Sequence, residues 1–298
     1  MNGEIQGFSL CQNGPKLTHL FFADDCLIFC RPTLDECNKI QELLAYYETA
    51  SGQVINKEKT TLYFNRNTNE VTQEAIKVAL DVPAIRHYEK YLCLPSFVGR
   101  NRTACFTQIK ERIWGHMQGW KEKLLSQAGQ EIMIKAVVQF IPVYLMSVFK
   151  LPVSLCKDIE AMVQKFWWGN GDAKKIHWVI WSFLCSSKSI GGMGFRDFQK
   201  FNHALLAKQV WRLFHNLDSF LFKVFSAKYF LHGNILEADA HPKCSYAWRS
   251  ILQARGVIKK RAIWKVGDGN LIDVWRHSWL PDLNHSKIVS PRTDSLVH

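Results

Sequence analysis

Apolar and polar positions alternate in short runs over the first 65 residues of the chain. Residues 17–30 place two apolar runs, rich in Phe and Ile, on either side of Ala23, Asp24 and Asp25. Short apolar runs on both sides of a turn are typical of a β-hairpin. The pattern therefore predicts a hairpin that carries the two adjacent aspartates at or beside its turn.

A helix is expected directly after this hairpin. Thr33 and Glu36 have the spacing of a capping box, in which each side chain bonds the other residue's backbone N–H group. Gly52 suits a left-handed end of the helix. Strands are expected at 54–55 and 60–64, so this part of the chain has an α+β pattern. One face of the expected helix gathers Cys37, Ile40, Leu43, Leu44 and Tyr47.

Beyond about residue 103 the apolar positions follow a helical period. We expect a second long helix to be capped by Ser126 and to end or kink at Pro142, and a third to have Pro152 in its first turn. A fourth helix should run from about residue 201. The apolar positions of the first three are Phe106, Ile109, Ile113 and Met117, then Ile132, Ala136 and Phe140, then Cys156, Ile159, Val163 and Phe166.

The last part of the chain predicts further short elements. Asp218 is placed to cap a short fifth helix. Residues 267–270, Gly-Asp-Gly-Asn, lie between the apolar runs 263–266 and 271–275, which is a strong hairpin pattern.

The length and charge of the chain indicate which class of partner it binds. The chain has 298 residues, of which 47% are hydrophobic, so it can bury a sizeable core. Its formal net charge is +12, but residues 1–100 carry a net of −2 and residues 101–298 a net of +14. A strongly basic second part favours an anionic partner such as nucleic acid.

Two features of the sequence indicate the cellular compartment of the protein. The start of the chain has no basic and apolar leader pattern, and the longest apolar stretch, 136–149, contains Pro142 and is too short to span a bilayer. The nine cysteines are odd in number and include no Cys-x-x-Cys pair. We therefore expect reduced cysteines in an intracellular protein of the nucleus or cytoplasm, neither secreted nor held in a membrane.

The adjacent aspartates suggest metal chemistry. Neighbouring carboxylates repel, so a site that keeps them together usually binds a cation, and hard oxygen ligands suit Mg²⁺. Paired Mg²⁺ ions drive nucleotidyl transfer. The alternative is a solvated turn, because Asp is a common turn residue.

Several segments, in chain order, resemble the reverse transcriptases of plant LINE-type (non-LTR) retrotransposons. Residues 20–25, Leu-Phe-Phe-Ala-Asp-Asp, look like the palm signature of this family of RNA-directed DNA polymerases. Residues 51–60 resemble its next block, and 91–95 with Gly99 and Arg100 its primer grip. The resemblance continues at 120–126, 166–169, 176–178, 191–197, 201–209, the Gly-Asp-Gly segment and 279–281.

This resemblance implies an α+β fold and three regions. Residues 1–100 would be a small partial palm of hairpin, helix and strands with the primer grip, 101–232 a mainly α-helical thumb and connector, and 233–298 a C-terminal β-hairpin module. The implied ancestral reaction is Mg²⁺-dependent nucleotidyl transfer on a template–primer. The implied partners are an RNA template and an RNA–DNA hybrid.

The resemblance also assigns roles to residues. Asp24 and Asp25 would be catalytic and hold the Mg²⁺ ions, and Lys57 or Lys59 would lie near the incoming triphosphate. The primer grip would be Tyr91, Leu92, Cys93, Leu94 and Pro95. The candidates for contact with the nucleic-acid backbone are Arg102, Lys110, Arg112, Lys121, Lys123 and Lys135, for which an ordinary solvated helix face is the alternative.

The sequence also departs from the family. The family's palm uses a third aspartate on an earlier strand, and no Asp occurs among the 23 residues before Asp24. Fingers, endonuclease and ribonuclease H regions are also missing, and Cys93 stands where the family usually has Gly. We therefore expect this chain alone to be inactive. Three hypotheses remain: a polymerase piece that joins a missing upstream portion, a non-catalytic nucleic-acid-binding remnant, and a translated relic without a selected role.

Three further features have an ordinary structural alternative. Residues 191–194, Gly-Gly-Met-Gly, are better explained by a turn than by a phosphate loop. Lys259, Lys260 and Arg261 could contact phosphate or act in nuclear import, but three residues do not decide it. Five tryptophans could stack on bases or lie in the core: Trp167, Trp168, Trp178, Trp181 and Trp211.

Overall fold

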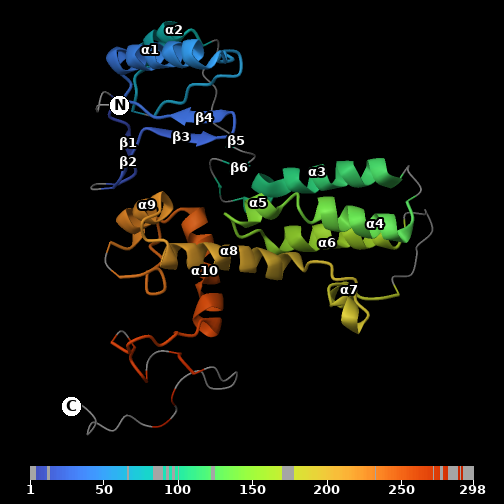
Figure 1. The fold of residues 1–298 in the computed structure, drawn as a ribbon. Coiled ribbons are helices and arrows are strands. Elements are labelled where there is room, and N and C mark those ends of the chain that lie inside the picture. The colour runs from blue at the N-terminus through green and yellow to red at the C-terminus, as the bar shows by residue number, and fades with distance from the viewer. Residues whose placement is uncertain are drawn as a thin grey trace. The chain divides into compact units, whose positions relative to one another are not determined.

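The computed structural model describes residues 5–11, 14–65, 67–82, 90–91, 94–95, 98–99, 101–121, 125–169, 178–231, 233–270, 272–275, 278–280, 288 and 290. The chain divides into two compact units. One consists of Met1–Phe106 with Asn216–Gly233, and the other of Thr107–His215 with Asn234–His298. Figure 1 labels their helices and strands.

The first unit combines small antiparallel hairpins with helices. Its described strands pair as β1 with β2, β3 with β4 and β5 with β6. Its elements are β1 (Phe8–Ser9), β2 (Lys16–Leu17), β3 (His19–Phe22), β4 (Asp25–Ile28), α1 (Leu34–Ser51), α2 (Glu70–Leu80), β5 (Lys90–Tyr91), β6 (Leu94–Pro95) and α9 (Phe220–Tyr229).

The hairpin and the first helix confirm their predictions. β3 pairs with β4 from His19 opposite Ile28 to Phe22 opposite Asp25. Thr33 caps α1 through a bond from the backbone N–H of Glu36 to its Oγ1, and Gly52 ends the helix with φ of 70°. The reciprocal half of the capping box is not formed, because Glu36 Oε2 accepts the N–H of Arg31 at 2.9 Å and not that of Thr33. Cys37 and Ile40 are buried as expected, but Tyr47 is exposed.

The segment between α1 and α2 differs from its prediction, because the described residues of 54–55 and 60–64 form no extended strand. Leu62 forms an isolated β-bridge, and two of the other backbone N–H groups bond locally. The N–H of Ile55 donates to Glu48 Oε1 at 2.7 Å, and the N–H of Thr60 donates to the carbonyl of Asn56 at 3.1 Å. A helix that the pattern did not predict, α2, then packs against α1 with Ile76 buried.

The second unit is helical in its described part. Its elements are α3 (Arg102–Lys121, from Thr107 on), α4 (Gln127–Met133), the π-helix η1 (Ile134–Val138), α5 (Val143–Met146), α6 (Val153–Trp167), α7 (Trp181–Leu184), the 3₁₀-helix η2 (Lys188–Ile190), α8 (Phe198–His215) and α10 (Tyr246–Arg261). α8 packs against α5, α6 and α10, and Figure 1 shows α10 crossing α8.

The core of the second unit follows the predicted helical faces of α3 and α6. All four predicted positions of α6 are buried, and so are Ile113 and Met117 on α3, whereas Ile109 is half-buried. Phe106 of α3 is buried as well, but it belongs to the first unit. Trp120 of α3 contacts Phe166 of α6, with ring centroids 6.0 Å apart. Pro152 precedes α6 as its N-cap rather than lying in the first turn.

The predicted face of the helix after Ser126 is wrong. Ser126 does cap α4, but Ile132 is 64% exposed and Phe140 56% exposed, while Ile134 and Val138 are buried. For Phe140 the cause is η1, because a π-helix holds more residues in each turn than an α-helix and so rotates the face that follows. Ile132 precedes η1, and its exposure has no such explanation.

Two smaller expectations are also corrected. Ser219, not Asp218, caps α9 through a bond from the N–H of Phe222. In the last part of the chain, residues 262–270 and 272–275 form a turn, with Gly269 at φ of 82°, but no strand. The flanks are held by a bond from the N–H of Trp264 to the carbonyl of Ser278 at 2.7 Å, so the described residues do not form the expected hairpin ladder.

Candidate metal-binding hairpin and cationic surfaces

The adjacent aspartates lie at the tip of the β3–β4 hairpin. Phe22 and Asp25 form its last residue pair, so Ala23 and Asp24 make a two-residue turn. Both carboxylate residues are exposed. Ala23 has φ of 50°, a left-handed conformation that costs a non-glycine residue about 1 kcal/mol. Strain of this kind tends to occur at functional sites, and here it lies directly before the acidic pair.

The described residues fit a divalent metal ion only in part. Mg²⁺ demands octahedral coordination by oxygen, and Asp24 and Asp25 supply two adjacent exposed carboxylates. The described part of the chain contains no group of three His, Cys, Asp or Glu side chains that could hold a metal ion. These residues therefore do not complete a two-metal centre.

The expected triphosphate lysines lie after α1. Lys57 Nζ forms an ion pair with Asp81 Oδ2 at 2.8 Å, and both side chains are exposed. This hydrogen bond raises the pKa of Lys57 and lowers the pKa of Asp81. Lys59 is exposed in the turn after Asn56, whose Oδ1 accepts its backbone N–H at 3.0 Å. Lys57 is thus ion-paired with the C-cap residue of α2, whereas Lys59 forms no ion pair among the described residues.

The expected primer-grip segment forms a short hairpin in its described part. Tyr91 pairs with Leu94, and Lys90 pairs with Pro95. Leu94 and Pro95 are half-buried. Leu92 and Cys93 lie outside the described residues.

The six expected backbone-binding cations do not form one uniform surface. Arg102 and Arg112 are exposed on α3. Lys110 Nζ lies 2.7 Å from Asp158 Oδ2 of α6, and Lys135 Nζ lies 2.7 Å from Glu131 Oε1. The side chain of Lys121 and the whole of Lys123 lie outside the described residues. Two of the six are therefore neutralised by nearby carboxylates.

Glu131 is shared between two lysines. Lys188 Nζ also lies 2.7 Å from its Oε1. Hydrogen bonds from Lys135 and Lys188 lower the pKa of the Glu131 carboxyl below its ordinary value. The ion cluster joins η1 to the 3₁₀-helix η2.

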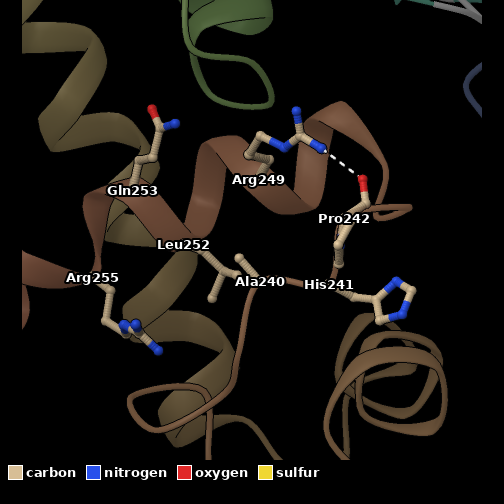
Figure 2. A pocket seen from close by; sticks show the side chains of 7 residues that line it. All are labelled: Ala240, His241, Pro242, Arg249, Leu252, Gln253 and Arg255. Atoms are coloured by element: carbon tan, nitrogen blue, oxygen red, sulfur yellow. Dashed lines mark hydrogen bonds between the residues drawn. The ribbon is translucent and has the colours of Figure 1, made fainter.

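Of the five cations of α10, the sequence analysis considered only Lys259, Lys260 and Arg261 as a possible binding site. A cavity of about 440 Å³ lies beside this helix and the loop before it, and Figure 2 shows its lining side chains. Its lining residues include cationic and polar side chains but no acidic one: Ala240, His241, Pro242, Arg249, Leu252, Gln253 and Arg255. The signal was present in the sequence, because residues 246–261 contain five Lys or Arg and no Asp or Glu.

No described helix is both long enough and apolar enough to cross a membrane.

Comparisons with known proteins place the chain among plant relatives. No protein-family model matches it. A protein of Arabidopsis thaliana named "Putative ribonuclease H protein" is 36% identical over 192 residues, which cover 63% of this chain and 31% of that protein. An uncharacterized mitochondrial protein of Arabidopsis thaliana is 41% identical over 144 residues, which cover 48% of this chain and 94% of that protein. The chain therefore belongs to the same family as this uncharacterized mitochondrial protein of Arabidopsis.

Proposed function

We propose that the chain derives from the reverse transcriptase of a LINE-type retrotransposon and that, by itself, it binds template–primer without extending it. The observation that carries the proposal is the β3–β4 hairpin, which presents Asp24 and Asp25 at a tight, strained turn. The relative named as a ribonuclease H supports a retroelement origin, because some reverse transcriptases of the resembled family carry a ribonuclease H region.

In this proposal the first 100 residues are part of a polymerase palm, and the helical region is thumb and connector. A polymerase portion that carries the third palm aspartate would be the natural protein partner. The chain spans about a third of the length of the ribonuclease-H-named relative. The described residues offer no support for ribonuclease H chemistry in this chain, because that chemistry needs several carboxylates around metal ions and no such group occurs among them.

The expected lack of catalysis follows from the number of palm carboxylates in this chain. Asp24 and Asp25 match two of the three palm carboxylates that would hold Mg²⁺ in the resembled family, where the ion supplies the chemistry of nucleotidyl transfer. No Asp precedes them in this sequence to act as the third palm carboxylate. Two carboxylates on an exposed turn bind metal too weakly and too loosely to position a nucleotide for transfer.

Nucleic-acid binding would rest on exposed cations of the helical region. Arg112 lies exposed on the part of α3 that belongs to the second unit. Lys110 would exchange Asp158 for a phosphate, an exchange that costs little because exposed ion pairs contribute only about 0–1 kcal/mol.

The test measures synthesis and binding side by side. We expect no primer extension on poly(A)/oligo(dT) with Mg²⁺ or Mn²⁺, and we expect binding of a short RNA–DNA hybrid that weakens steeply with salt. Arg112→Gln should weaken hybrid binding, whereas Lys165→Gln on the exposed side of α6 should not. Extension that disappears in Asp24→Ala would show an active polymerase, and hybrid binding weaker than about 100 μM at low salt would leave only a relic.

A further inference from the structure

Helix α10 has an unusual charge pattern. Its 16 residues include Arg249, Arg255, Lys259, Lys260 and Arg261, and no acidic residue. None of these five cations has a carboxylate partner among the described residues, in contrast to Lys110 and Lys135. Unpaired cations concentrated on one element attract a polyanion.

Lys259, Lys260 and Arg261 are exposed, and Arg249 and Arg255 are half-buried. Trp248, Ile251 and Ala254 are buried against the rest of the unit. Arg249, Gln253, Gly256 and Lys260 follow one another at spacings of four, three and four residues, so they share one face. Gln253, Gly256 and Lys260 on this face are exposed.

Two arginines of α10 are held in fixed positions at the cavity beside it. Arg249 Nη2 donates to the carbonyl of Pro242 at 3.0 Å, the bond drawn in Figure 2. Arg255 Nη1 donates to the carbonyl of Ala238. These are the only hydrogen bonds of the two guanidinium groups among the described residues, and a guanidinium has five N–H donors. Both arginines are therefore oriented by the loop and still able to donate to an anionic oxygen.

The packing of the fold does not explain why residue 256 is a glycine. A glycine in the middle of a helix weakens the helix relative to alanine. A Cβ atom built at Gly256 meets no atom within 4 Å, so packing does not require the glycine. A glycine on an exposed helix face permits close approach of a ligand to the backbone, and here it lies between Arg249 and Lys260.

Exposed aromatic side chains lie beyond the cationic end of α10. Trp264 is 40% exposed and Trp211 of α8 is 46% exposed. Phe214 connects them, because its ring lies edge-on to Trp264 at 6.4 Å and 6.4 Å from Trp211 between centroids. His215 lies 4.0 Å from Trp211. The indoles thus belong to one ring cluster that follows directly after Lys259, Lys260 and Arg261.

We propose that the exposed face of α10 and the indoles of Trp211 and Trp264 bind single-stranded nucleic acid. Phosphates would lie along the α10 cations and approach the backbone at Gly256, and unpaired bases would stack on the indoles. A duplex keeps its bases inside, so the indoles select the single-stranded form. The inference rests on the proposed function for nucleic acid as the partner, and it adds a second surface, distinct from α3, for the unpaired strand.

The first experiment separates phosphate contact from stacking in the full chain. Fluorescence anisotropy is measured with labelled 12-nucleotide single strands of RNA and of DNA, with a 12-base-pair RNA–DNA hybrid, and with heparin as competitor. The triple variant of Lys259, Lys260 and Arg261 to Gln should weaken single-strand binding at least tenfold at low salt and reduce the log–log salt slope by about 2, since each phosphate contact on a single strand contributes about 0.7. Trp264→Leu should weaken single-strand binding about fivefold or more with the slope unchanged.

Control variants on α6 and α3 test whether the effect on single-strand binding is specific to α10. Lys157→Gln with Lys165→Gln removes two exposed cations from α6 and should leave single-strand binding unchanged. Arg112→Gln should weaken hybrid binding but leave single-strand binding intact. A wrong α10 inference would show as single-strand binding that the α10 variants do not change, whereas a wrong proposed function would show as absent hybrid binding. Equal binding of single strand and heparin, with no effect of Trp264→Leu, would overturn the inference in favour of a general polyanion surface.

The second experiment uses Gly256, where stability and binding should change in opposite directions. Gly256→Ala should raise the unfolding midpoint, because alanine favours the helix and meets open space. It should also weaken single-strand binding severalfold, because the methyl group lies where the phosphate approaches. Gly115→Ala, another helical glycine with open space around it, should raise the midpoint without weakening single-strand binding. If Gly256→Ala leaves single-strand binding unchanged, the proposed contact at the helix backbone is wrong.

Discussion

The buried side chain of Asn202 in α8 accepts the backbone N–H of Leu151 at its Oδ1, at a distance of 2.9 Å. Its Nδ2 donates to the carbonyls of Met146 and Phe149, at 2.7 and 2.9 Å. One amide therefore satisfies three backbone groups between α5 and α6. This gives the asparagine in the motif at residues 201–209 a structural explanation.

Replacement of Asn202 by leucine should lower the free energy of unfolding by about 3 kcal/mol or more. Leucine has a similar volume, but it leaves three buried backbone groups without partners, at about 1–3 kcal/mol each. Urea unfolding followed by tryptophan fluorescence measures the change. Asn38→Leu on the exposed side of α1 serves as the control, and an equal loss there would contradict the argument.

Replacement of Gly192 by alanine should destabilise the protein by about 1–3 kcal/mol, because the added carbon must displace backbone. A Cβ atom at this position would lie 2.2 Å from the carbonyl oxygen of Ser186 and 2.8 Å from that of Phe183. Gly115→Ala should instead stabilise by about 0.5–1 kcal/mol. Thermal unfolding of both variants decides the matter, and a stable Gly192→Ala protein would refute the close approach.

The Glu131 cluster should make stability depend on acid pH. The pKa of Glu131 is held below its ordinary value of 4.5 by Lys135 and Lys188. A carboxyl with a lowered folded pKa stabilises the fold above its unfolded pKa, and this stability is lost as the pH falls through the folded pKa. Glu131→Gln should therefore be less stable at pH 7 and lose less stability below pH 4.5. Unfolding curves from pH 3 to 7 test this, and parallel curves for both proteins would count against it.

Glu160 should show the opposite dependence. Burial raises the pKa of its carboxyl, with the charge of Asp197 adding to the effect and a hydrogen bond from the Phe198 N–H opposing it. A raised folded pKa means that the folded state binds the proton more tightly, so stability falls as the pH rises from 4.5 through the folded pKa. Glu160→Gln should remove this fall. The same pH series measures it, and an unchanged slope in that interval would exclude the assignment.

Cysteine reactivity should follow burial. Burial raises the pKa of Cys156 and Cys185 to about 12, so neither is a thiolate near neutral pH. We expect iodoacetamide at pH 8 to alkylate the exposed Cys26 much faster than either of them in the folded protein. In urea the three rates should converge. Mass spectrometry of timed samples measures the order, and rapid alkylation of folded Cys156 would contradict it.

The sequence by itself determined those elements whose signals are local. The β3–β4 hairpin, the Thr33 cap of α1 and the buried face of α6 each depend on residues within a few positions of one another, and all are found as predicted. Turn chemistry, capping and apolar periodicity act at this range, so they can be read without knowing the fold.

Only the tertiary structure decided the rest. Lys110 meets Asp158 and Lys57 meets Asp81 across 48 and 24 residues, and these pairings changed which cations of the candidate site are available. The π-helix η1 rotated the face of the residues after it, which left Phe140 exposed. Contacts between distant residues, and backbone geometry imposed by packing, are absent from any local pattern, because the free energy that selects them comes from the assembled core.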